Sequence, residues 1–275
     1  MAVDPVLVTD RDSLLANVHA KAARTLGGRP TRDSVLAAVA ACHAAAGTAI
    51  GARLTEAETL GERPACRAGC AFCCHQHIAA TPAELLGIAA EVATWPAERI
   101  EALRRRLEQD APRIAALDHA GRQAARIACP MLDRKTGQCG AYGQRPVACR
   151  SHFSTLRTAC ERDFRTRGAR RPNDKGVPTM ESPKATAGAA LVGLELALDE
   201  LGLAVEPVEL AVGLRLALDR PDVFDRWLAG ENPFPPLPAP PNSARARLGR
   251  SYADMLGDVR ARLAPARKTS DKSTN

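Results

Sequence analysis

Four cysteines lie close together in the stretch PACRAGCAFCCHQH, residues 64–77. They are Cys66, Cys70, Cys73 and Cys74. On a helix their side chains would fall within roughly 100° of one another, and a tight turn at Gly69 would also bring them together. Uncoordinated thiols in such a group oxidise or, once ionised, repel one another. A bound metal resolves both problems, so the stretch predicts a metal site.

A second group of cysteines lies downstream, in CPMLDRKTGQCGAYGQRPVACRSHF, residues 129–153. Its members, ten positions apart, are Cys129, Cys139 and Cys149. Between the first two, the sequence is typical of a short β-hairpin with Gly137 in its turn, which would place these two cysteines near each other. Pro146 is expected to open a helical turn that carries the third.

Seven thiols are more than the four ligands of one tetrahedral zinc or one 4Fe–4S cluster. Two metal sites, a bridged binuclear site, or one cluster with free thiols would each account for the surplus. Adjacent thiols seldom bind one metal comfortably, so we expect Cys73 and Cys74 to face different irons or different metals. Three histidines could complete a coordination sphere, and the first is the best placed: His75, His77 and His152.

Three arginines lie near the cysteine groups in the sequence, and two further cysteines lie outside them. Several thiolates around a metal leave a net negative charge, which the nearby Arg67, Arg145 and Arg150 would offset in part. Cys42 lies in an alanine-rich helical stretch, where we expect it to be a small buried hydrophobic residue. Cys160 lies on a further expected helix and is interpreted as structural.

The two groups together resemble the YkgJ-type cysteine-cluster family, whose members are described as zinc- or iron-chelating proteins. The matching pieces are CRAGCAFCC, CPMLD, GQCGAY and RPVACR, over about residues 64–153. The resemblance implies metal ligation by all seven cysteines: Cys66, Cys70, Cys73, Cys74, Cys129, Cys139 and Cys149. One branch of the family comprises flagellin lysine N-methylases, which implies an iron–sulfur centre used with S-adenosylmethionine.

A second pattern overlaps the first group of cysteines. Cys66, Cys70 and Cys73 also fit the motif of radical S-adenosylmethionine enzymes, where three cysteines hold a 4Fe–4S cluster and leave one iron open for a co-substrate. Those enzymes carry the motif after the first strand of a β/α barrel. Here the preceding LTEAETLGERPA is not typical of a strand, and alternating βα units are not evident elsewhere. A radical barrel enzyme is therefore disfavoured.

The cysteine count argues against a disulfide-bonded protein. Nine cysteines are an odd number, so they cannot all pair within one chain. Nine in 275 residues is also far below the cysteine density of small disulfide-bonded proteins. The first residues show no basic segment followed by an apolar run, so we expect no signal peptide. No stretch approaches about 18 uninterrupted apolar residues, so we expect no membrane span. We expect a cytoplasmic protein whose clustered cysteines bind metal or act in redox chemistry.

Composition favours helices over sheets. Apolar residues make up 45% of the chain and aromatics only 3%, and alanine and leucine supply much of the apolar share. We expect a mainly α protein with helical flanks around a central, irregular, cysteine-rich metal-binding domain that contains a short β-hairpin. The expected parts are an N-terminal helical region 1–60, a cysteine-cluster domain 61–165, a C-terminal helical region 166–264 with a proline-rich connector, and a disordered tail 265–275.

Local signals place several helix ends. One helix is expected from Asp12 to the glycines at 27–28, and the next after Pro30 with Asp33 or Ser34 as its cap. Thr81, Pro82 and Glu84 are typical of an N-cap, a proline at the first helical position and an acid at the third, so a helix should run from there to about Thr94. Another is expected to begin near Pro96, and residues 166–185 are predicted to be a linker.

The formal net charge of +7 does not by itself identify the class of molecule that the protein binds. The densest basic stretch, residues 157–171, could contact an acidic partner, but few aromatics are available for base stacking, so nucleic acid is unlikely and a protein partner is possible. Three functions remain: a metal-binding module, an iron–sulfur enzyme that transfers methyl groups or electrons, such as an S-adenosylmethionine-dependent lysine N-methyltransferase, and a zinc-stapled basic interaction protein. We favour an iron–sulfur or zinc protein of unassigned activity.

Overall fold

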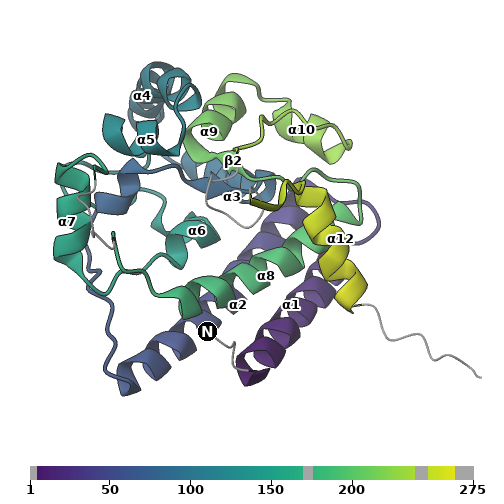
Figure 1. Cartoon of the computed structure of the whole chain (residues 1–275). Helices are drawn as coiled ribbons and strands as arrows, with labels where there is room; N and C mark the ends of the chain where they lie inside the picture. The colour runs from purple at the N-terminus through teal and green to yellow at the C-terminus, as the bar shows by residue number, and fades with distance from the viewer. Residues whose placement is uncertain (1–4, 170–175, 239–246, 264–275) are drawn as a thin grey trace, which may run out of the picture. The chain divides into compact units, whose positions relative to one another are not determined.

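A computed structural model describes residues 5–169, 176–238 and 247–263 of the chain (Figure 1). It is mainly helical, with 63% of residues in helices and a two-stranded antiparallel sheet, which confirms the expected fold class. Residues 1–238 form one compact unit and residues 239–275 another. In the second unit the structure describes one named helix, α12 (Tyr252–Leu263).

Three long helices form the scaffold of the first unit: α1 (Pro5–Leu26), α2 (Arg32–Thr59) and α8 (Glu181–Asp199). Figure 1 shows them side by side, and α8 contacts both of the others. Apolar side chains that recur at helical spacing fill their interface; fully buried examples are Leu15, Val35, Val39, Ala46 and Leu194. The N-terminal helices therefore pack on a helix from the C-terminal half, while the predicted division at residues 60 and 165 stays a prediction.

The ends of these helices correct three sequence-based boundaries. The first helix begins at Pro5, well before Asp12, and the second is capped by Thr31. Ser34 returns a hydrogen bond to the backbone of Thr31, which makes a capping box that satisfies two helix-end groups at once. α8 begins at Glu181, inside the predicted linker, whose residues 170–175 lie outside the described ones.

The helix α2 is long and apolar enough to cross a membrane by length and composition alone. In the structure one face of it packs against α1, α8 and α3 (Pro82–Ala93). The buried residues on that face follow helical spacing and include Val35, Val39 and Cys42. The apolar side chains on this face of α2 thus pack in the interior of the first unit.

A second helical layer covers the side of the cysteine-rich region. α3 is capped by Thr81 and Glu84 as expected and ends at Ala93, and α4 (Ala97–Ala115) follows Pro96 as expected. Leu103 and Leu107 of α4 are buried, and this helix packs against α9 (Leu210–Asp219). The remaining helices of this layer are α5 (His119–Ala125) and α10 (Val223–Leu228).

The cysteine-rich region itself is built from short elements. They are the 3-10 helices η1 (Phe72–His75) and η2 (Tyr142–Gln144), and the helices α6 (Val147–Arg150) and α7 (Arg157–Arg165). The sheet pairs β1 (Ala79–Ala80) with β2 (Val208–Glu209), a pairing that the sequence did not predict. The predicted hairpin is present as one antiparallel bridge between Leu132 and Cys139. The predicted tail, 265–275, lies outside the described residues.

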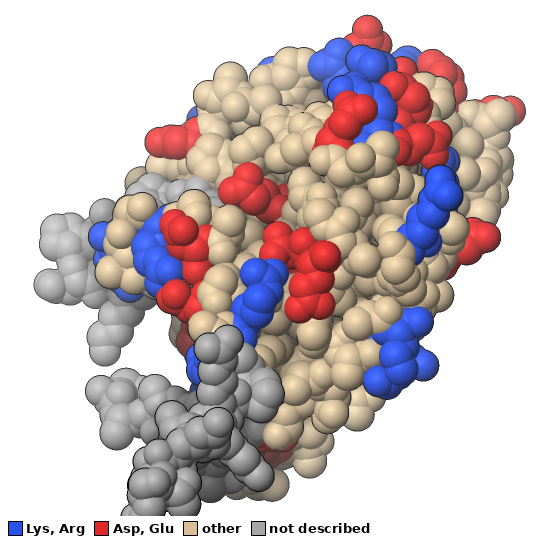
Figure 2. Space-filling model, turned by 90° about the vertical axis from the view of Figure 1, so that its right-hand side faces the viewer, with Lys and Arg blue, Asp and Glu red and all other residues tan. Residues whose placement is uncertain are grey.

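Charges of both signs mix on the face shown in Figure 2. Basic and acidic side chains alternate there over a largely uncharged surface. Elsewhere in the described part of the chain, exposed charges form ion pairs, such as Arg32 with Asp225 and Arg226 with Glu231. Such exposed pairs contribute little to stability.

Candidate metal centre

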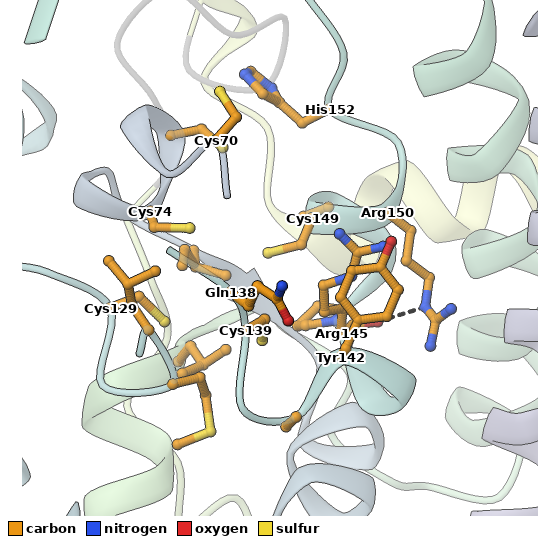
Figure 3. A pocket seen from close by; sticks show the side chains of 18 of the residues that line it. Cys70, Cys74, Cys129, Gln138, Cys139, Tyr142, Arg145, Cys149, Arg150 and His152 are labelled. Carbon is orange, nitrogen blue, oxygen red and sulfur yellow. Dashed lines mark hydrogen bonds between the residues drawn. The ribbon is translucent and has the colours of Figure 1, made fainter. Parts of the chain in front are cut away.

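All seven cysteines of the two predicted groups line one cavity of about 680 Å³. Figure 3 shows Cys74 and Cys129 on one side of it, Cys149 and Cys139 near its middle and Cys70 above. The sulfur atoms therefore face a common space although the two groups are more than fifty residues apart in the sequence. The structure brings the predicted residues together; their role as ligands stays a prediction.

Two tight turns shape the first cysteine segment. Gly69 adopts a positive φ of 79°, which glycine tolerates readily, and the amide of Cys70 closes the turn on the carbonyl of Arg67 at 3.0 Å. The 3-10 helix η1 then carries Cys73 and Cys74. The irregular backbone expected for a metal-binding turn is thus present, and the continuous-helix alternative is wrong.

The hairpin holds the second segment against the first. Gly137, in its turn, has a positive φ of 70°, and a Cβ atom built on it would lie 2.5 Å from the carbonyl oxygen of Gly69. The two glycine turns therefore meet backbone to backbone. This contact places Cys139 and Cys70 on neighbouring turns of the cavity wall.

Backbone hydrogen bonds join the two segments directly. The amide of Cys129 donates to the carbonyl of Cys74 at 2.7 Å. The guanidinium of Arg122, only 1% exposed, donates to the carbonyl of His75 at 3.1 Å and to that of Ile127. One buried cation on α5 thus ties together the chain on both sides of this junction, a role that the sequence analysis missed because no local pattern marks Arg122.

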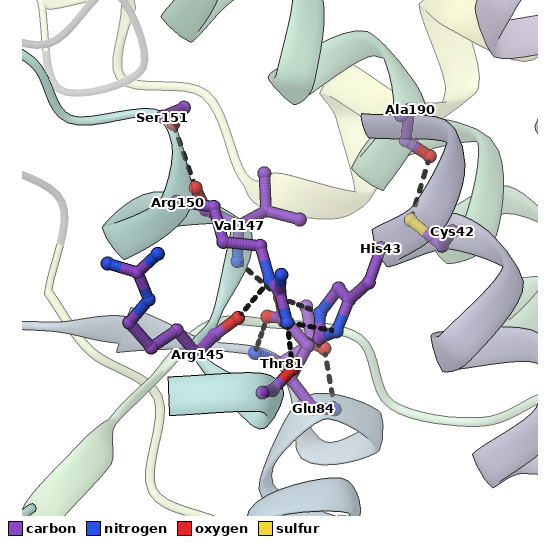
Figure 4. Close-up of polar contacts among 10 residues, drawn as sticks. Cys42, His43, Thr81, Glu84, Arg145, Val147, Arg150, Ser151 and Ala190 are labelled. Carbon is purple, nitrogen blue, oxygen red and sulfur yellow. Dashed lines mark hydrogen bonds and ion pairs between the residues drawn. The ribbon is translucent and has the colours of Figure 1, made fainter. Parts of the chain in front are cut away.

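Cys149 is carried by the helical turn that Pro146 opens, as predicted. The first free amide of that turn, on Val147, donates to Glu84 Oε1 at 2.7 Å. Glu84 is 1% exposed and also accepts from the amide of Thr81 at 3.0 Å. A single carboxylate therefore bridges the starts of α3 and α6 (Figure 4).

The same carboxylate is tied to the scaffold. His43 on α2 lies with Nε2 3.3 Å from Glu84 Oε1, and its Nδ1 lies 3.3 Å from Nη2 of Arg150. Because a guanidinium can only donate, Nδ1 accepts and Nε2 donates to Glu84. The chain from Arg150 through His43 to Glu84 links the Cys149 turn to the long helix α2.

Burial and mutual proximity raise the pKa of three of the cavity thiols, those of Cys73, Cys129 and Cys149. Burial, followed by the proximity of Cys73, raises the pKa of Cys149 to about 12. Burial, followed by the proximity of Cys149, also raises the pKa of Cys129 well above its ordinary value. A hydrogen bond with Cys74, and then burial, raises that of Cys73. A metal that binds thiolates must displace these protons.

The donor chemistry of the cavity fits a thiophilic metal. Soft thiolates select zinc, copper(I) and iron–sulfur clusters over hard cations. As the side chains lie, no three His, Cys, Asp or Glu residues among the described ones are arranged to hold a metal ion. The sulfur atoms of Cys73 and Cys74 instead interact with each other, so side-chain rotation has to accompany binding.

The other residues considered from the sequence fall into two sets. Those that line the cavity are Arg67, Arg145, Arg150, His77 and His152. His75 is not among them: its Nδ1 bonds to the carbonyl of Ala71 at 3.1 Å and its ring packs on Phe164. Cys42 is buried in α2, with its thiol on the carbonyl of Ala190, as expected. Burial, followed by the proximity of Cys70, Cys73 and Cys160, raises the pKa of Cys66, so Cys160 lies near the first cysteine group.

Comparison with known proteins agrees with this geometry. Residues 65–168 match the model of the CxxCxxCC family, described as a "putative zinc- or iron-chelating domain". This stretch is therefore similar to metal-chelating cysteine-cluster domains. The domain includes both cysteine groups and continues through α7, so it also contains Cys160. The resemblance seen in the sequence is confirmed, over less than half of the chain. No curated protein and no solved structure matches the chain.

Proposed function

We propose that the cysteine-cluster domain binds an iron–sulfur cluster of the 4Fe–4S type, with zinc as the alternative metal, in the cytoplasm. The convergence of seven thiols on one cavity carries this proposal. One closed zinc site would use four of them and leave three thiols beside it. A cluster, or a bridged pair of metals, uses more of the set.

The chain's own residues supply what such a centre needs. Cys129 and Cys139 lie at the two ends of the hairpin, which backbone hydrogen bonds close and join to Cys74. Cys149 lies on α6, whose start the Glu84 bridge holds. Arg122 and Arg145 place positive charge near these thiols and offset the negative charge of thiolates. An iron–sulfur cluster, when bound, supplies one-electron chemistry; a zinc ion supplies structural cross-linking or Lewis acidity.

Anaerobic purification followed by visible spectroscopy and analysis of iron, sulfide and zinc tests the proposal. We expect a brown protein with iron and sulfide in equal amounts. A colourless protein with stoichiometric zinc would contradict the iron–sulfur assignment and keep the metal site. A protein without metal after anaerobic purification, which also takes up none on reconstitution, would contradict both.

Single substitutions then test the ligands. Cys139→Ala and Cys149→Ala should each lower the metal content, because each removes a thiol from the cavity. Cys42→Ala is the matched control, since that thiol is buried in α2 and bonds to Ala190 rather than facing the cavity. Equal metal content in all three variants would remove the first two from the ligand set.

A further inference from the structure

The cavity has two walls of different chemistry. Figure 3 shows Cys74 and Cys129 on one side and Tyr142, Arg145 and Arg150 on the other. Its volume of about 680 Å³ lies in the range of small-molecule sites, roughly 300–1,000 Å³. We call the side with Cys74 and Cys129 the sulfur wall and the side with Tyr142, Arg145 and Arg150 the arginine wall. A metal bound at the sulfur wall would share the cavity with the space beside the arginine wall.

Arg145 is the available cation of that wall. Its guanidinium stacks 3.7 Å from the centre of the Tyr142 ring, and its Nε is buried without a hydrogen-bond partner. Among the described residues no carboxylate pairs with it. Stacking fixes the plane of the guanidinium and leaves its N–H edge free, which suits a planar two-oxygen acceptor.

The neighbouring arginines are already engaged. Arg150 donates to the carbonyls of Gly143 and Arg145 and contacts His43. Arg122 donates to backbone carbonyls at the junction of the two segments. Arg67 also lines the cavity but is exposed to solvent, so Arg145 is the half-buried, stacked cation that remains. A planar cation of this kind matches a carboxylate better than a phosphate.

The rest of the lining is largely apolar. Side chains of this kind around the cavity are Ile78, Ile88, Met131, Leu132, Phe153 and Leu210. An apolar lining with one charged anchor is typical of a site for an organic molecule that carries a single anionic group. A fully hydrated inorganic anion would gain nothing from these side chains.

We propose that the cavity binds a small organic carboxylate beside the metal, with the carboxylate on the guanidinium of Arg145 and the apolar part on the aliphatic lining. The inference rests on the proposed metal centre, which occupies the sulfur wall. It adds a co-ligand to that site. Arg145 then does more than offset the charge of the thiolates, because a lysine could do that equally well.

Calorimetric titration of the full-length, metal-loaded protein with phenylacetate and with phenylacetamide tests this. The two probes share their shape and differ in charge. We expect phenylacetate to bind and phenylacetamide to bind at least tenfold more weakly. Arg145→Gln should weaken phenylacetate by roughly ten- to a hundredfold, the range for hydrogen bonds to charged groups, and Arg145→Lys should restore only part of it.

Arg99→Gln is the matched control. Arg99 also stacks on an aromatic ring, 3.4 Å from the centre of Trp95, and donates to the carbonyl of Gly140 at 3.3 Å, but it does not line the cavity. At equal metal content, phenylacetate binding should therefore be unchanged. Metal content is measured for every variant. If Arg145→Gln loses metal, Tyr142→Leu, which removes only the stacked ring, takes its place and should weaken phenylacetate severalfold.

Failure of this inference differs from failure of the metal centre. A metal-loaded protein that does not bind phenylacetate, or that binds it equally well without Arg145, would overturn the carboxylate site and leave the metal proposal standing. A protein without metal would instead contradict the proposed function. Equal binding of the acid and the amide would show an apolar site without a charged anchor, which also overturns the inference.

Discussion

Burial raises the pKa of two cavity thiols, Cys129 and Cys149, in the metal-free protein. The pKa of Cys149 is about 12, and that of Cys129 is also raised, chiefly because each lies in the interior. In the unfolded chain both thiols return to an ordinary pKa near 9.0. Between these values the folded state keeps protons that the unfolded state has lost.

The stability of the metal-free, reduced protein should therefore fall as pH rises above about 9. The unfolded state then binds fewer protons than the folded state, so the free energy of unfolding decreases by about 1.4 kcal/mol per pH unit for each such thiol. Urea unfolding at a series of pH values measures this slope. Cys149→Ala should make the slope shallower, and a stability that rises over this range would contradict the assignment.

The close backbone contact between Gly137 and Gly69 leads to a second prediction about a single residue. Gly137→Ala would place a methyl group 2.5 Å from the carbonyl of Gly69, at a positive φ that alanine disfavours. We expect a loss of at least about 2 kcal/mol in stability and a lower metal content, because both turns carry cysteines. Gly143→Ala is the control, since nothing lies within 4 Å of its added methyl. Thermal unfolding and metal analysis compare the two; equal behaviour would show that the turns can separate.

At the scale of elements, Glu84 does more than a helix cap. It completes the capping box of α3 with Thr81, holds the first amide of α6 and contacts His43 of α2. The box could be predicted because Thr81 and Glu84 stand three positions apart. The contacts with Val147 and His43 could not, because they join residues far apart in the chain that no local pattern connects.

The same distinction explains the other elements. The hairpin around Gly137 and the turn after Pro146 depend on local turn chemistry and were predicted correctly. The pairing of β1 with β2 involves two residues in each strand, too short for a periodic signal, and depends on long-range packing. The Arg122 junction depends likewise on burial that only the folded chain shows.

The Glu84→Gln variant should release its metal faster than the unsubstituted protein, while its helices stay formed. The amide offers one acceptor oxygen in place of two, so either α3 or α6 loses its partner, at a cost of about 2 kcal/mol. Loss of a group that orients a ligand typically weakens metal binding by roughly 10–100-fold. Transfer of metal to a chelator measures the rate.

A second capping box supplies the control for this substitution. Thr31→Ala removes the N-cap of α2, a residue whose side chain bonds to the amide of Ser34 rather than to a cysteine turn. It should cost about 1 kcal/mol in stability without changing the release rate. If Thr31→Ala and Glu84→Gln release metal equally fast, general loosening of the fold would explain the effect and the Glu84 bridge would not.

For the whole first unit, the helical scaffold and the cysteine turns rest on different interactions. α1, α2 and α8 bury a continuous apolar interface, and a Cβ atom added to Gly193 would lie 2.5 Å from the carbonyl of Leu15, so these helices are in close contact. The cysteine turns are held by backbone hydrogen bonds, such as that from the amide of Cys129 to the carbonyl of Cys74, and they carry the thiols that a metal would bridge. Apolar burial does not depend on metal, whereas the proposed metal centre would make the order of the turns depend on it.

Removal of the metal with a chelator under reducing conditions should therefore loosen residues 64–78 and 127–153 and leave the scaffold folded. Far-ultraviolet circular dichroism should change little, because most helical residues lie outside these turns. Hydrogen exchange should rise in the turns and stay slow in α2 and α8. Glu84 and His43 would keep the base of α6 attached to α2, so exchange at Val147 should rise less than at Cys70. Collapse of the whole helical signal on chelation would instead mean that the metal is needed for the scaffold as well.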